Sequence, residues 1–261
     1  MEILNYSQEH FKVFILILIR ISVVLFLFPV FGSRVFPILV KAGLALIIAA
    51  TLLPVVTTDH FFFPDNTIHI AILIVSEFMI GLIIGLIARL FFSAAQIAGH
   101  VIAFQMGFGM INVLDPQTGA QVSILDQIAY WMVLLIFLIL NGHHILITCL
   151  ADSFRIVEPG MIHLNKELLL QILGSSSDMF ILAIKIGAPG IVSLLFVSTA
   201  FGLCAKFAPQ MNILIAAFPV KIIVGLFFFC TTLHLIALSV RSYIHDFKPA
   251  LSKLLVQMGG G

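Results

Sequence analysis

Six ionisable side chains lie inside or beside long apolar runs of the sequence, where a charge has strong chemical consequences. They are Arg20, Lys41, Glu77, Arg89, Lys185 and Lys221. A charge at the centre of a bilayer costs roughly 2.5–3.5 kcal/mol on insertion scales, so each group is expected to face protein or a water-filled cavity. Because Glu77 is the only carboxylate within these runs, we expect partner subunits to supply carboxylates or carbonyls to the cations. Arg89 and Lys185 have an alternative, since long side chains near helix ends can reach the membrane interface.

Enzyme chemistry has little support in the sequence. His143 and His144 are adjacent on a predicted helix, so they point about 100° apart and cannot chelate one ion together. We expect them to pack or to form hydrogen bonds. Cys149, Cys204 and Cys230 show no metal-ligand spacing, and we expect three buried thiols. Zinc-protease, Walker and nucleophile-elbow motifs are lacking. We therefore expect no enzyme activity, no catalytic residue, no metal and no cofactor.

The elements that position these residues are predicted to be membrane helices. Apolar residues make up 61% of the 261 and charged residues only 10%, whereas soluble domains are about 45–50% apolar and about 25% charged. The solvent of this chain must therefore be lipid, other apolar subunits, or both. The net charge of +1 gives no reason to expect nucleic acid as a partner.

Six apolar stretches have the roughly 20 residues that a spanning helix needs. They are residues 11–31, 35–57, 68–92, 128–150, 180–205 and 212–240. We expect an all-α integral membrane protein with these helices in hairpins, forming one membrane-embedded domain over residues 1–258. Within it, residues 93–125 form a helix and a loop, residues 164–172 form a short amphipathic helix, and residues 241–258 form a basic tail. Residues 259–261 are expected to be a flexible end or a cloning remnant.

The third stretch carries Glu77, Gly81, Gly85 and Arg89 at every fourth position. This spacing places two glycines in one stripe between an acid and a base. Gly81 and Gly85 would let a neighbouring helix approach closely, although glycine is also simply common in membrane helices. We favour a helix-packing stripe.

The segment from Gly107 to Gly119 has the local chemistry of a loop, with two close glycines and an Asp-Pro pair. It is nevertheless rich in Phe and Met. Because irregular backbone cannot face lipid, this apolar loop must be buried in protein or line a cavity. The residues alone leave both a packing loop and a pore closure open.

An ordered set of short motifs resembles the FliR family of flagellar type III export-gate proteins. The central motifs are Asn112–Gln121, Asn141–His144 and Ser153–Phe154; later ones are Ala188–Pro189, Phe201–Asn212 and Phe218–Lys221. The resemblance covers essentially the whole chain. It implies a FliP-like part followed by a FliQ-like part, in the flagellar basal body of the bacterial inner membrane. It also implies FliP-like, FliQ-like and FlhB-like partner subunits, membrane lipid around them, and unfolded protein substrates in transit.

The resemblance further implies that the loop is a pore plug, made of Met106, Gly107, Phe108, Gly109, Met110, Ile111, Asp115, Pro116, Gly119 and Gln121. Soft Met and Phe side chains suit a closure that re-packs around a passing chain. The resemblance adds Lys206, Gln210 and Asn212 to the six ionisable residues as expected contacts between subunits or helices.

Two other functions remain open at the level of sequence. A small-solute secondary transporter would use Glu77 as a proton site and would show paired broken helices. A structural membrane scaffold would use the same polar residues only for assembly, and substitutions in its loop would have no effect on function.

Overall fold

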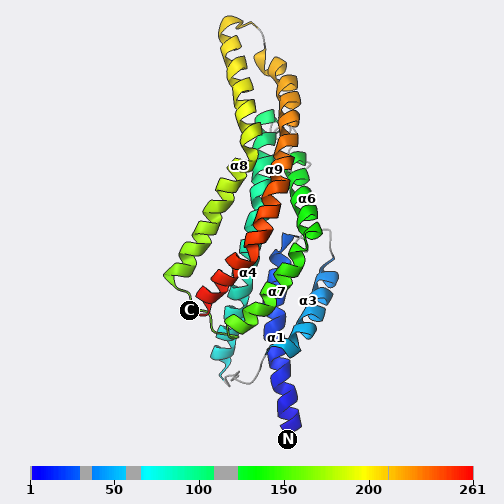
Figure 1. The fold of residues 1–261 in the computed structure, drawn as a ribbon, viewed down its shortest axis with the longest axis vertical. Helices are drawn as coiled ribbons and strands as arrows, with labels where there is room; N and C mark the ends of the chain where they lie inside the picture. The colour runs from blue at the N-terminus through cyan, green and yellow to red at the C-terminus, as the bar shows by residue number, and fades with distance from the viewer. Residues whose placement is uncertain (1, 30–36, 57–65, 109–122, 211, 261) are drawn as a thin grey trace. The chain divides into compact units, whose positions relative to one another are not determined.

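The computed structural model describes residues 2–29, 37–56, 66–108, 123–210 and 212–260 (Figure 1). Within these ranges the regular structure is helical, with no strand, which confirms the predicted all-α membrane fold. The helices are α1 (Glu2–Leu27), α3 (Ile38–Leu52), a short 3-10 helix (Leu53–Val55), α4 (Thr67–Met106), α6 (Ile124–Ile139), α7 (Gly142–Ile156), α8 (Lys166–Phe207) and α9 (Ile213–Met258).

Among the described residues, three helices are long and apolar enough to cross a membrane: α4, α8 and α9. Each is longer than the apolar run that predicted it. The expected helix at 93–106 is the continuation of α4, the amphipathic segment near 166–172 is the start of α8, and the basic segment 241–258 completes α9. Helix α3 has only 15 residues, so it is shorter than a full span.

The predicted helix over residues 128–150 is broken, and this part of the prediction is wrong. Helix α6 ends at Ile139 and α7 begins at Gly142, and the two qualify as a span only when they are counted as a bent pair. Asn141 lies at the break with a φ of 56°, in the left-handed region. Asn adopts this conformation more readily than most residues, and glycine follows it. The continuous apolar run on either side concealed this local signal.

The chain divides into two compact units. Unit 1 comprises Met1–Leu90, Asn141–Ser176 and Ile244–Gly261, and unit 2 comprises Phe91–Leu140 and Ser177–Tyr243. Helices α4, α8 and α9 contribute residues to both units, because the boundaries fall within them. The expectation of a single membrane-embedded domain over 1–258 stays a prediction.

Unit 1 is built on a close approach of α1 and α4. A Cβ atom added at Gly81 would lie 2.8 Å from the Arg20 carbonyl oxygen and 3.0 Å from Val23 Cβ. At Gly85 the added atom would lie 2.8 Å from Leu27 Cβ. The two glycines of the α4 stripe therefore face α1, and the absence of their side chains is what lets the two backbones come so near.

The end of α9 is also part of the core of unit 1. Phe247, Leu251, Leu254, Leu255 and Met258 are almost fully buried. The last carbonyl groups of the helix are capped by the connection between α7 and α8, because the His163 N–H donates to the Met258 carbonyl oxygen at 2.9 Å and the Asn165 amide to that of Gln257 at 3.4 Å. Such partners satisfy carbonyls that a helix end leaves open.

Unit 2 packs small residues of α4 against its neighbours. Ala94, Ala95, Ala98 and Ala103 are buried. A Cβ at Gly190 of α8 would lie 2.8 Å from Ile102 Cδ1. The rings of Phe92 and Phe137 meet edge to face with centroids 5.3 Å apart, an arrangement that aromatic pairs favour.

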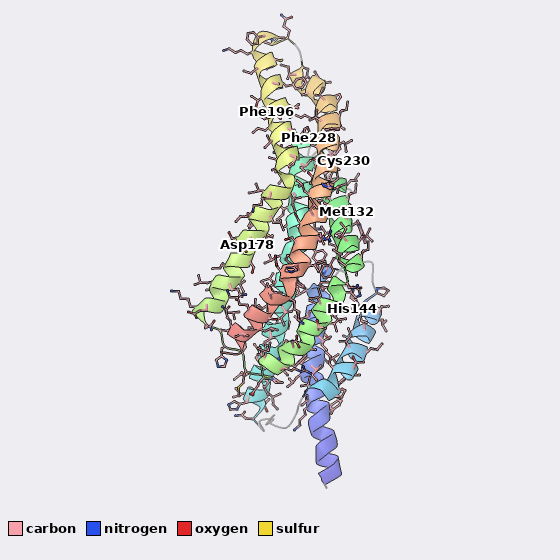
Figure 2. The ribbon with its side chains drawn as sticks, viewed as in Figure 1. Met132, His144, Asp178, Phe196, Phe228 and Cys230 are labelled. Atoms are coloured by element: carbon pink, nitrogen blue, oxygen red, sulfur yellow. The ribbon has the colours of Figure 1, made fainter. Side chains whose placement is uncertain are left out.

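Much of the surface of α8 and α9 is left uncovered by the residues that the structure describes. Each of these helices contains an apolar stretch of 18 residues that is long enough to span a membrane. Only 28% of this stretch is buried in α8, and only 22% in α9. Phe196 on α8 and Cys230 on α9 are examples of exposed side chains (Figure 2). The expectation of three buried thiols is therefore wrong for this chain by itself: Cys149 is buried, but Cys204 and Cys230 are exposed. These surfaces need lipid or protein partners to cover them.

Candidate functional site

The first candidate site is a buried ion pair in unit 1. Arg20 of α1 donates from Nε to Oε2 of Glu77 at 2.6 Å and from Nη2 to Oε1 at 2.9 Å. Both side chains have an exposed fraction of 0%. The planar guanidinium suits this two-bond geometry, which a lysine could not reproduce. Two of the predicted polar residues are thus partners of each other, so Arg20 needs no carboxylate from another subunit.

The rest of the cluster satisfies the remaining polar atoms of this pair. Arg20 Nη1 donates to Ser153 Oγ of α7 at 3.0 Å, and the Gly160 N–H donates to Glu77 Oε1 at 3.0 Å. The Phe154 ring covers the guanidinium, with its centroid 4.0 Å from Cζ. A buried ion pair is tolerated when such extra hydrogen bonds are present. The cluster therefore joins α1, α4, α7 and the turn that follows α7.

The other predicted cations lie in different surroundings. Lys41 of α3 is buried, and its ammonium lies 5.7 Å from the centroid of the Phe26 ring, within reach of a cation–π contact. Arg89 is exposed on α4, and Lys185 and Lys206 are exposed on α8. Lys221 of α9 is half-buried.

The predicted polar residues Gln210 and Asn212 lie between α8 and α9, and both are exposed. Asn212 caps α9, because its Oδ1 accepts a bond from the Ile215 N–H at 3.4 Å. Such a side-chain acceptor satisfies an N–H that the first turn of a helix leaves open.

The second candidate site is the end of α4 in unit 2, where the predicted plug begins. The Gly107 N–H donates to the Phe104 carbonyl oxygen at 3.0 Å, and the Phe108 N–H donates to that of Ala103 at 3.1 Å. With the Gly107 φ of 97°, these bonds form a Schellman cap, for which glycine is the usual residue. Seven predicted plug residues lie outside the described ranges: Gly109, Met110, Ile111, Asp115, Pro116, Gly119 and Gln121.

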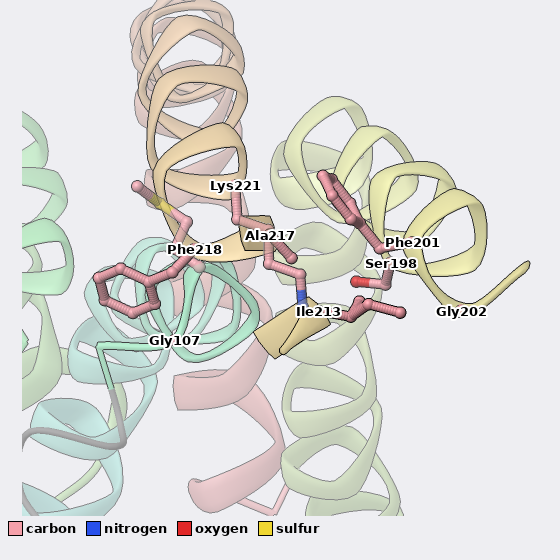
Figure 3. Close-up of a pocket in the computed structure, with 9 residues that line it drawn as sticks. Gly107, Ser198, Phe201, Gly202, Ile213, Ala217, Phe218 and Lys221 are labelled. Atoms are coloured by element: carbon pink, nitrogen blue, oxygen red, sulfur yellow. The ribbon is translucent and has the colours of Figure 1, made fainter. Parts of the chain in front are cut away.

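A pocket of about 370 Å³ opens beside this cap (Figure 3). It is lined by Met106 and Gly107, by Ser198, Phe201 and Gly202 of α8, and by Ile213, Ala217, Phe218 and Lys221 of α9. Ser198 Oγ donates to the Leu194 carbonyl oxygen at 2.8 Å, and Lys221 is the charged residue among those that line the pocket. The structure thus brings Met106 and Gly107, two residues of the predicted plug, together with Lys221, which sequence analysis had placed among the polar contacts.

The described structure resumes after the predicted plug at the start of α6. Ser123 caps α6, since its Oγ accepts a bond from the Leu125 N–H at 3.3 Å. Three residues later, Asp126 Oδ2 lies 3.4 Å from His100 Nδ1 of α4. Sequence reasoning missed Ser123, His100 and Asp126. A serine three residues before an acid, at the start of an apolar run, was a usable helix-start signal.

No group of three or more His, Cys, Asp or Glu side chains able to hold a metal ion occurs in the part of the chain that the structure describes. His143 and His144 lie with ring centroids 4.3 Å apart, on successive positions of α7. The geometry of the described residues consists of helix contacts and a pocket beside the end of α4.

Comparison with known proteins agrees with this picture. Residues 11–247 match the family described as bacterial export proteins, family 1. The flagellar biosynthetic protein FliR of Bacillus subtilis is 34% identical over 259 residues, which cover 98% of this chain and 99% of the relative. The FliR proteins of Escherichia coli and Aquifex aeolicus are each 30% identical, with 84% of each chain covered for the first and 92% and 93% for the second. The chain therefore belongs to the FliR family of bacterial export proteins.

Proposed function

We propose that this protein is a subunit of the flagellar type III protein export gate, where it helps to form and to close the conduit for unfolded flagellar substrates. Family membership supports a role as a membrane-embedded component of flagellar export. The inner membrane at the flagellar basal body is the proposed location. No enzyme activity is part of this role, so energy and substrate selection must come from other components.

The closing role is supported by the two described positions between which the Met- and Phe-containing segment after α4 begins and ends. The segment begins at the Gly107 cap of α4, beside a mostly apolar pocket. It ends at the capped start of α6. Apolar side chains at a constriction can close a pore by excluding water. Met and Phe can also adapt their shape when a polypeptide must pass.

The exposed surfaces of α8 and α9 support the forming role. The described residues leave a large share of the apolar stretches of both helices uncovered, and the exposed lysines Lys185 and Lys206 lie on α8. A lysine in an apolar surface favours a protein neighbour that offers carboxylates or carbonyls. FliP-like and FliQ-like subunits are the proposed neighbours, with an FlhB-like subunit alongside and lipid on the remaining surface.

The transporter alternative loses its main support. It required Glu77 as a proton site, but both oxygens of Glu77 accept hydrogen bonds from Arg20 and the side chain is fully shielded from solvent. No other described feature favours solute transport.

The closing role is tested by deleting residues 107–119 in the gate assembled with its partner subunits. Ion conductance in planar bilayers should rise, while the partner subunits should co-purify in unchanged amounts. A variant in which the same residues are replaced by a Gly/Ser segment of equal length separates the loss of the apolar side chains from the shortening of the chain. Conductance at the level of the unaltered gate in both variants would remove the closing role.

A further inference from the structure

We infer that the pocket beside the end of α4 is a lipid site, which holds one acyl chain of an anionic phospholipid against its apolar wall and the headgroup against Lys221. This inference goes beyond the proposed function and does not depend on the closing role. All residues that line the pocket belong to unit 2, so the site lies within one compact unit.

The pocket is bounded by one face of each of two helices. Ile213, Ala217 and Lys221 recur at every fourth position of α9, which places them on one face of that helix. Ser198 and Phe201 share a face of α8 by the same spacing rule. Small side chains at positions 198 and 217 leave the space between the two faces open. Its volume of about 370 Å³ lies in the range of small-molecule sites.

Lys221 gives the pocket its charge. The residue is half-buried, and Figure 3 shows its side chain directed into the pocket, on the side of Ile213 and Ser198. Within the part of the chain that the structure describes, no carboxylate lies within ion-pair distance of its ammonium. A charge beside apolar walls in a membrane protein is costly unless an opposite charge accompanies it. The lysine therefore favours an anionic group at this place.

The wall of the pocket sets the second requirement on the ligand. Phe201, Ile213 and Phe218 offer hydrocarbon and aromatic surface, against which an apolar chain is stabilised by about 25 cal/mol per Å² buried. A nucleotide or a sugar would bring polar groups that this wall leaves without hydrogen bonds. A metal ion would be repelled by the lysine. The ligand that meets both requirements carries a hydrocarbon chain and an anionic headgroup.

The surroundings identify the source of such a ligand. The pocket lies between α8 and α9, whose apolar stretches are long enough to span a membrane and are mostly uncovered by the described residues. Bilayer lipid is therefore adjacent to the opening. A helix of a protein neighbour is about 10–12 Å wide with its side chains, which is more than this volume admits, whereas an acyl chain is narrow. Basic pockets between membrane helices bind anionic headgroups in the same way.

The test is photolabelling of the purified full-length chain in phosphatidylcholine nanodiscs. The probes are phosphatidylglycerol and phosphatidylcholine, each with the same diazirine-bearing acyl chain. Peptide mass spectrometry should locate the phosphatidylglycerol adducts on residues 198–202 and 213–221. The yield at these peptides should be roughly tenfold higher than with phosphatidylcholine, which corresponds to about 1.4 kcal/mol of binding free energy.

The charge requirement is tested by Lys221→Met, which keeps the length of the side chain and removes its ammonium. The phosphatidylglycerol yield should fall to the phosphatidylcholine level, and Lys221→Arg should restore the preference. Lys185→Met is the matched control, because Lys185 is exposed on α8 and does not line the pocket; its yields should equal those of the unaltered chain.

The space requirement is tested by Ser198→Leu, which places a larger apolar side chain in the pocket. It should lower the yield of both probes at these peptides. Thr199→Leu is the matched control, since Thr199 is the next residue of α8, is exposed and donates to a backbone carbonyl of its own helix as Ser198 does. Circular dichroism verifies that each variant keeps its helical content.

Three results would overturn the lipid site. They are adducts spread evenly over α8 and α9, equal yields from the two lipid probes, and a Lys221→Met variant that keeps the phosphatidylglycerol preference. A free fatty acid with the same diazirine chain is the third probe. If it labels these peptides while phosphatidylglycerol does not, the assignment to a membrane phospholipid is wrong.

Discussion

The Arg20 guanidinium and the Glu77 carboxylate form a two-bond ion pair that joins α1 to α4 and has no contact with solvent. The pair lies one turn of α4 before Gly81, whose missing side chain lets the Arg20 backbone come close. Close backbone packing and charge pairing therefore support each other at one place in unit 1. Removing either one should weaken the other.

Arg20→Ala or Glu77→Ala should each destabilise the chain by about 3–5 kcal/mol, because each leaves an uncompensated buried charge. The measurement is an SDS titration of the purified chain, followed by circular dichroism. A double replacement by leucine should recover much of the loss, since apolar pairs often substitute for buried ion pairs. Lys185→Ala, at an exposed position, is the control. Equal losses in all three single variants would contradict a special role for the pair.

Gly81→Leu and Gly85→Leu should each cost about 1–3 kcal/mol of stability through overpacking against α1. Gly43→Leu offers a matched comparison in unit 1, because nothing lies within 4 Å of an added Cβ at that position. The same SDS titration measures all three variants. A Gly43 variant as unstable as the other two would show that the loss does not come from crowding against α1.

Ser153→Ala should cost about 1.5–3 kcal/mol, the usual contribution of a hydrogen bond to a charged group. Its hydroxyl accepts from Arg20 at 3.0 Å and donates to the Leu150 carbonyl oxygen at 2.7 Å. Thr148→Ala on the same helix removes a comparable bond to the backbone at an exposed position and should change stability little. If the SDS titration gives both variants the same loss of stability, the hydrogen bond from Arg20 adds no stability of its own.

Thiol labelling should report which surfaces partner subunits cover. In the purified chain in detergent, a small maleimide should modify Cys204 and Cys230, which are exposed, and spare Cys149, which is buried. In the assembled gate, protection of Cys204 or Cys230 would identify a covered surface. Serine variants at each position assign the labelled sites by mass spectrometry. Rapid labelling of Cys149 in the folded chain would contradict its position in unit 1.

The helical class and the main helices could be predicted from the sequence, because long apolar runs with few charges have few alternatives. The stripe of Gly81 and Gly85 also predicted the close approach of a helix, since the spacing alone places both on one face. The identity of that helix could not be predicted. Nothing near residue 20 indicates that its partner is residue 77, because helices far apart in sequence meet only after tertiary packing.

The candidate sites were predictable to different degrees. Gly107 could be recognised as the end of a helix from local chemistry alone. Gly225 could not be distinguished from other membrane glycines, because the Met106 side chain that lies against it comes from a distant position in the sequence. The break at Asn141 was hidden by the apolar residues around it. Local signals of this kind are weak when the surrounding pattern predicts one continuous helix.

The composition of unit 1 has a consequence for biosynthesis. This unit contains Met1–Leu90 together with Ile244–Gly261. Residues that are synthesised early can therefore complete their packing only after residues that are synthesised much later. Arg20 and Glu77 are both synthesised in the first third of the chain, so their ion pair can form before the last helix is made. The buried apolar side chains of Phe247, Leu251 and Met258 are added only when the last helix is synthesised. During the interval, the half-finished unit presents open apolar surface to the insertion machinery, and this interval is when the nascent chain most needs protection from misassembly.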